Sequence, residues 1–159
     1  MTTLDQYSEI KKEASRKSAG KLMNNYIAYI QAVYAIHQFS HWLCKSPQFY
    51  GNHLLFQRIY EAAGDRLDAA VEKTIGVFGN DAINPNDQMA TLKKLVGKYS
   101  SEDHLTNSLA IEEAFLSVAK ETYEALKESN DITLGLDDLI MAQCNEAETS
   151  VYLLKQAMG

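Results

Sequence analysis

Apolar side chains recur at every third or fourth position along most of this chain, which is the spacing of one face of an α-helix. The pattern predicts four long helices, at residues 18–43, 49–78, 100–128 and 136–157. Residues 89–96 fit a short additional helix, and residues 5–17 are amphipathic and either extend the first helix or fray. No segment alternates apolar and polar residues as a half-buried strand would, so the pattern predicts an all-α protein.

Turn-forming residues separate these helices at unequal intervals. Pro47 lies in a short first link and breaks the helix there, because the residue before a proline avoids the helical conformation. Gly79-Asn80 ends the second helix, and a longer connection containing Asn84-Pro85 precedes the third. Ser129-Asn130-Asp131 forms the last short turn. This order predicts a four-helix bundle with a short extra helix in its long connection between the second and third helices, a connectivity that ferritin-like four-helix bundles share.

The composition narrows the class of protein. The chain has 159 residues, of which 46% are hydrophobic and 23% charged. We expect one bundle domain at 18–159, preceded by a polar and basic extension at 1–17. No apolar run approaches the ~18 residues of a membrane span, and the first residues lack the apolar core of a signal peptide. We therefore expect a cytoplasmic protein in which Cys44 and Cys144 are reduced.

The charge is distributed unevenly along the chain. The net charge is −6, but residues 1–21 by themselves carry +2. The acidic remainder argues against extensive contact with nucleic acid, because affinity for a phosphate backbone depends on lysine and arginine. The N-terminal segment is the exception, and its candidate DNA contacts are Lys11, Lys12, Arg16 and Lys17.

Four side chains form a candidate metal site that one subunit cannot complete. Asp68 and Glu72 are four residues apart, so they share a helix face and can present two carboxylates to one cation. His53 lies on the same predicted helix, roughly 22 Å from Asp68 along its axis. The break at Pro47 folds the first helix back, which can bring His41 close to His53. Either the pattern is an ordinary acidic face beside structural histidines, or the two halves meet between subunits.

The residues around this set resemble a known family. The stretch from His41 to His53 is similar to the signature H-W-x-x-K-G-P-x-F-x-x-x-H of Dps proteins, the DNA-protecting mini-ferritins of starved bacterial cells. The matching positions between the two histidines are Trp42, Lys45, Pro47 and Phe49. The pair Asp68-x-x-x-Glu72 follows at the distance that the family pattern requires, and the resemblance covers most of the chain.

The resemblance implies a fold, an activity and a site. Dps proteins are dodecameric shells that oxidise Fe(II), typically with hydrogen peroxide, at ferroxidase sites between two-fold-related subunits. By position, His41 and His53 of one subunit and Asp68 and Glu72 of another would bind iron, with zinc as a substitute and Trp42 adjacent. Ferric iron would be stored inside the shell and would enter through pores lined by acids such as Glu128, Asp131, Asp137 and Asp138.

The sequence departs from the family pattern in ways that leave alternatives open. Gln57 occupies a position that is often acidic, which lowers the negative charge facing a second iron, although Glu61 lies one turn further on. Ser46 replaces the usual glycine. Two other functions therefore remain: a DNA-compacting protein with a weak iron site, and a structural bundle with a degenerate site. No E-x-x-H, H-E-x-x-H, phosphate-binding loop or dinucleotide motif occurs.

Overall fold

A computed structural model describes residues 3–100 and 102–159, so residues 1, 2 and 101 of the expected elements lie outside the described chain. The described chain is helical and contains no strand. In order, its elements are α1 (Thr3–Leu43), α2 (Phe49–Phe78), the 3₁₀ turn η1 (Asn80–Ala82), α3 (Pro85–Val96), α4 (His104–Glu128) and α5 (Leu134–Met158). The all-α prediction and the short extra helix in the long connection are confirmed.

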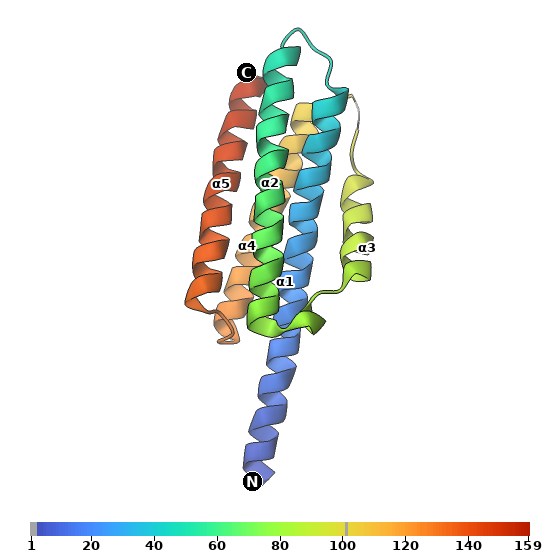
Figure 1. Ribbon diagram of the computed structural model, residues 1–159. Helices are drawn as coiled ribbons and strands as arrows, with labels where there is room; N and C mark the ends of the chain where they lie inside the picture. The colour runs from blue at the N-terminus through green and yellow to red at the C-terminus, as the bar shows by residue number, and fades with distance from the viewer. Residues whose placement is uncertain (1–2, 101) are drawn as a thin grey trace.

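Helices α1, α2, α4 and α5 lie side by side as a four-helix bundle, with α3 outside it (Figure 1). The core consists of large side chains from the four helices with little or no exposed surface, among them Met23, Tyr26, Ile30, Phe56, Ile59, Phe115, Leu126, Ile140 and Leu154. Their removal from water is the main favourable contribution to folding. Met158, at the end of the apolar stripe expected for the last helix, remains 46% exposed.

Helix α1 begins well before the bundle does. It is continuous from Thr3, so residues 5–17 extend the helix, and its first turns project beyond the other helices (Figure 1). Further along this helix, Ser15 donates a hydrogen bond of 2.7 Å to Asp131, in the turn between α4 and α5. At Gly20 an added Cβ would lie 2.9 Å from the Cβ of Ala82, so glycine lets η1 approach α1 closely.

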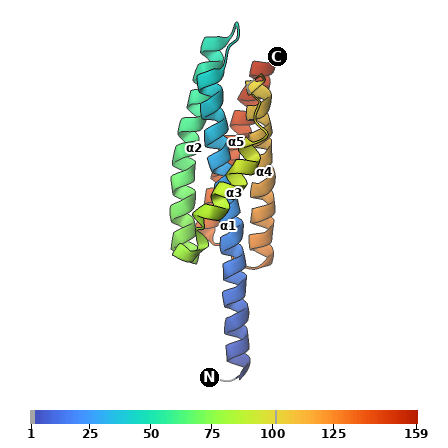
Figure 2. The ribbon, with the colours of Figure 1, turned by 90° about the vertical axis from the view of Figure 1, so that its right-hand side faces the viewer.

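Helix α3 begins four residues before the expected Met89. Asn84 caps it, accepting hydrogen bonds from the backbone N–H groups of Asn86 and Asp87, and Pro85 stands at the first helical position, where its missing N–H is not needed. The helix lies against the outer face of α1 (Figure 2). The amide of Gln88 holds it there by donating to Asn24 Oδ1 over 2.7 Å.

The described helices include none that is both long enough and apolar enough to span a bilayer.

Candidate metal site at the α1–α2 turn

Two histidines meet where the chain turns from α1 into α2. His41 lies in the last turn of α1, and His53 lies near the start of α2. The break between Leu43 and Phe49 folds the two helices against each other, so the imidazole rings stack with their centroids 3.7 Å apart and their planes at 22°. The structure thus brings together the two histidines that the sequence singled out.

Reciprocal hydrogen bonds orient the two rings. Nδ1 of His41 lies 2.8 Å from the backbone carbonyl of His53, and Nδ1 of His53 lies 2.8 Å from the carbonyl of His41. A carbonyl oxygen only accepts, so each Nδ1 carries the proton and each Nε2 keeps its lone pair. Neutral imidazoles oriented in this way are the form in which histidine binds a metal. Spacing in the sequence gave no sign of these bonds, because they depend on how the helices pack.

The surroundings of the pair are aromatic and apolar. The ring of Phe49 stacks on His53 at 5.1 Å, and the ring of Tyr60 meets His41 edge-on at 5.3 Å. Several large apolar side chains of this turn remain exposed, and we call them the turn patch: Trp42, Leu43, Phe49, Tyr50 and Leu54. Tyr50 is 73% exposed and Trp42 is 59% exposed. A cluster of this kind marks a surface suited to contact with another molecule.

The carboxylates lie elsewhere on α2. Asp68 and Glu72 are exposed, and neither side chain has a hydrogen-bond or ion-pair partner among the described residues. Within residues 3–100 and 102–159, no three histidine, cysteine, aspartate or glutamate side chains converge closely enough to hold a metal. The subunit therefore presents two imidazoles at one place and two carboxylates at another.

Gln57, on the same helix as His53, is already engaged. Its Nε2 donates a hydrogen bond of 2.8 Å to Glu61 Oε1. This bond occupies one carboxylate oxygen of Glu61, the residue that could otherwise restore an acid beside the histidines.

The N-terminal cations and the expected pore acids lie away from the histidine pair. Lys11, Lys12 and Lys17 are exposed on α1, whereas Arg16 donates a hydrogen bond to the carbonyl of Val77. Among the acids at the α4–α5 turn, Asp131 accepts the bond from Ser15 described above. The others are Glu128 and Asp138, which are exposed, and Asp137, which is partly buried.

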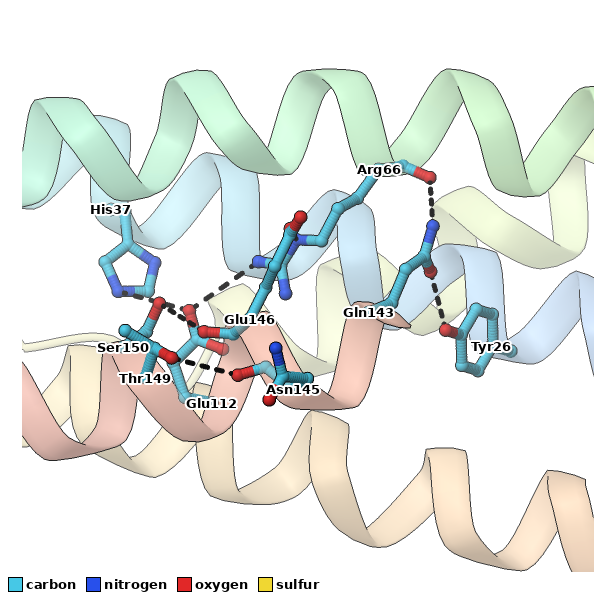
Figure 3. A network of polar contacts seen from close by, with 9 residues as sticks. All are labelled: Tyr26, His37, Arg66, Glu112, Gln143, Asn145, Glu146, Thr149 and Ser150. Carbon is cyan, nitrogen blue, oxygen red and sulfur yellow. Dashed lines mark hydrogen bonds and ion pairs between the residues drawn. The ribbon is translucent and has the colours of Figure 1, made fainter. Parts of the chain in front are cut away.

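A second polar cluster lies inside the bundle, and sequence analysis missed it. His37, Arg66 and Glu112 come from α1, α2 and α4, and all three are buried (Figure 3). Burial lowers the pKa of His37 to about 4, and the nearby charge of Arg66 adds to this effect, although the hydrogen bond to the Val33 carbonyl opposes it. Burial raises the pKa of Glu112 to about 7, against the opposing pull of Arg66. Nothing in the 3.6-residue pattern separates such residues from apolar core positions.

Similar solved structures identify the fold of this chain, whereas the sequence comparisons find no relative. No protein-family model matches the sequence, and no curated protein matches it. Among solved structures, Dps from Thermosynechococcus elongatus is similar with a TM-score of 0.79 and 18% identity, over 93% of this chain and 94% of that one. DpsC from Streptomyces coelicolor has a TM-score of 0.77 and 18% identity, over 92% of this chain and 86% of that one.

A third structure, the Dps protein of Vibrio cholerae O1, is described as a member of a broad superfamily of ferritin-like diiron-carboxylate proteins. Its TM-score is 0.77 and its identity 18%, over 92% of both chains. The chain therefore has the ferritin-like bundle fold of Dps proteins.

Proposed function

We propose that this protein is a mini-ferritin of the Dps family that oxidises Fe(II) at sites between subunits and stores ferric iron in a hollow shell, limiting oxidative damage in the cytoplasm. The observation that carries the proposal is the histidine pair. Both Nδ1 atoms donate to backbone carbonyls, so both Nε2 lone pairs of His41 and His53 are available to a metal ion. The two imidazoles of one subunit form half of an iron site.

A second copy of the chain would supply the other half. In a two-fold dimer, an α2 helix running antiparallel to its mate would bring Asp68 and Glu72 of one subunit to the histidines of the other. The turn patch supports this arrangement, because contact between copies would remove its exposed aromatic side chains from water. A dodecamer with sites at each two-fold interface is the assembly that we propose.

The ligand types suit the reaction. Imidazole nitrogen and carboxylate oxygen both bind Fe(II), and zinc would fit the same donors. Carboxylates are hard ligands that favour Fe(III) and so assist loss of an electron. One hydrogen peroxide accepts two electrons, so reduction to water consumes two Fe(II) and two protons and leaves two Fe(III). Because Gln57 is neutral and bonded to Glu61, we expect one strong iron site per histidine pair and a weak or absent second one.

The test is rapid oxidation of Fe(II) by peroxide, followed by ferric absorbance. Changing both His41 and His53 to Ala should abolish the fast phase, because both nitrogen ligands are lost. The matched control is His104→Ala, since His104 is partly buried at the start of α4 and bonds to Tyr99. An unchanged fast phase in the double variant would remove His41 and His53 from the site.

DNA compaction is a second candidate function, favoured by the projecting part of α1. Lys11 and Lys12 are exposed on the first turns of α1, which extend beyond the bundle, and Lys17 is exposed just after Ser15. Weak contacts repeated over many subunits would add up. A gel shift at low and moderate salt tests this function, and deleting residues 1–17 should abolish any shift that depends on these cations.

A further inference from the structure

Two tyrosines continue the series of ring contacts that begins at the histidine pair. Tyr60 follows His53 on α2 by about two helical turns, and its ring meets that of His41 with the centroids 5.3 Å apart and the planes at 65°. The ring of Tyr34, on α1, meets Tyr60 at 5.7 Å and 77°. The four rings are therefore in contact one after another along the boundary between α1 and α2.

The position of the Tyr60 ring is fixed from both sides. Gln38 donates a hydrogen bond of 3.0 Å from Nε2 to the Tyr34 hydroxyl, which holds Tyr34 in place. Tyr34 and Tyr60 are both partly buried, and the edge-on contact between them is a preferred geometry of aromatic pairs. Tyr60 is thus held against His41, a proposed iron ligand.

Tyr60 differs in its chemistry from the other aromatic residues near the histidines. The ring of Phe49 stacks on His53 at 5.1 Å, but a phenyl ring carries no hydroxyl and does not readily give up an electron. Trp42 is 59% exposed, and its ring packs against Phe39 at 6.0 Å. A phenol can give up an electron together with its hydroxyl hydrogen, and it still carries that hydrogen at neutral pH.

A single iron ion cannot complete the reduction of peroxide. Hydrogen peroxide accepts two electrons, whereas oxidation of one Fe(II) supplies one. Gln57 is neutral and donates its hydrogen bond to Glu61, so we expect no strong second iron site beside the first. One Fe(II) reacting alone with peroxide would give Fe(III), hydroxide and a hydroxyl radical. A site that limits oxidative damage therefore needs a second electron donor close to the first iron.

We propose that Tyr60 supplies this second electron through its contact with His41, an inference that rests on the function proposed above. Fe(II), hydrogen peroxide and the Tyr60 phenol are converted into Fe(III), hydroxide, water and the Tyr60 phenoxyl radical. The O–O bond breaks, the iron and the phenol each give one electron, and the hydroxyl hydrogen of Tyr60 ends in the water. The next Fe(II) reduces the radical, and a proton from solvent restores the hydroxyl. Two Fe(II) are then oxidised per peroxide without release of a hydroxyl radical.

Freeze-quench EPR of the full-length assembled protein tests whether Tyr60 is the donor. Fe(II) equimolar with the subunits is mixed with excess peroxide, so that no Fe(II) remains to reduce the radical. The wild-type protein should give a tyrosyl radical signal that narrows when ring-deuterated tyrosine is incorporated. Tyr60→Phe should lose the signal and keep the rapid rise in ferric absorbance, because its ring still packs against His41.

A second measurement follows the fate of the peroxide. With excess Fe(II) and a hydroxyl-radical spin trap, Tyr60→Phe should raise the yield of spin adduct. It should also lower the number of Fe(II) oxidised per peroxide from about two toward one, because the trap takes the oxidising equivalent that Tyr60 would have received. The matched control is Tyr152→Phe, which removes the same hydroxyl from a residue on α5 that is 60% exposed and should change neither result.

The role of Tyr60 is refuted if Tyr60→Phe keeps both the radical signal and the wild-type stoichiometry, or if the deuterated wild-type protein gives no tyrosyl signal. The deuterated wild-type experiment needs no variant, so it decides the question even if Tyr60→Phe does not assemble. Changing both His41 and His53 to Ala should abolish the radical together with the fast ferric phase. A fast phase that persists in that double variant would instead refute the proposed iron site, so the two failures are distinguishable.

Discussion

Glu112 and His37 have opposite proton preferences, although their side chains lie 3.8 Å apart in the same buried space. Burial favours the neutral form of each, which means a protonated carboxyl and an unprotonated imidazole. The pKa of Glu112 rises from 4.5 to about 7, and that of His37 falls from 6.5 to about 4. Between pH 4.5 and 6.5 the folded chain therefore holds the proton on Glu112, where the unfolded chain holds it on His37.

Because the two pKa shifts are opposite, the combined contribution of Glu112 and His37 to the free energy of unfolding should vary little with pH. The raised pKa of Glu112 makes stability fall as pH rises from 4.5 to 7, whereas the lowered pKa of His37 makes it rise from pH 4 to 6.5. Each slope is at most about 1.4 kcal/mol per pH unit, and the two oppose each other. Thermal melts should thus show Tm rising with pH in Glu112→Gln and falling in His37→Gln. Two variants with the same pH dependence as wild type would contradict this account.

At the scale of the helix, close packing requires glycine at one helical position, whereas another glycine has room for a side chain. Gly20 and Gly76 both lie inside long helices, where alanine is intrinsically preferred. A Cβ at Gly20 would press on Ala82 at 2.9 Å, whereas a Cβ at Gly76 would meet nothing within 4 Å. From the sequence alone, alanine would be expected to have the same effect on stability at both positions.

Alanine substitutions at the two glycines should consequently act in opposite directions. We expect Gly20→Ala to destabilise the protein by about 1–3 kcal/mol, because η1 must move away from α1. Gly76→Ala should stabilise it by about 0.5–1 kcal/mol through helix propensity. Chemical denaturation of both variants measures the difference. Stabilisation by Gly20→Ala would mean that η1 is free to shift.

At the scale of the whole molecule, the proposed iron site requires two chains, and mixing defective subunits tests this requirement. One variant carries His41→Ala and His53→Ala, and the other carries Asp68→Ala and Glu72→Ala. Each alone should lack the fast oxidation phase. In a mixed two-fold dimer, the histidines of one chain face the carboxylates of the other, so one of its two sites is intact. Equal mixing of unfolded chains before assembly should restore about a quarter of the wild-type activity. No recovery above the separate variants would exclude a site shared in this way.

The helices and their order follow from local features of the sequence. Helix α2 spans Phe49–Phe78 as expected, because Pro47 and Gly79 stand at its two ends and apolar residues repeat between them. The starts of α1 and α3 were less well predicted, because an amphipathic segment can fray or extend, and because the first turn of α3 is set by the Asn84 cap and lies outside the apolar pattern. Periodicity and capping involve residues that are close in sequence, so both can be recognised from the sequence.

Contacts between side chains of different helices depend on the tertiary structure. The break at Pro47 predicted contact between His41 and His53, but the hydrogen bond that each Nδ1–H donates to the other's backbone carbonyl depends on the rotation of α1 against α2. Their role as iron ligands stays a prediction. The cluster around Arg66 depends on four helices at once and left no mark in the local pattern. Helix rotation is set by the packing of residues distant in sequence, and a one-dimensional pattern does not contain it.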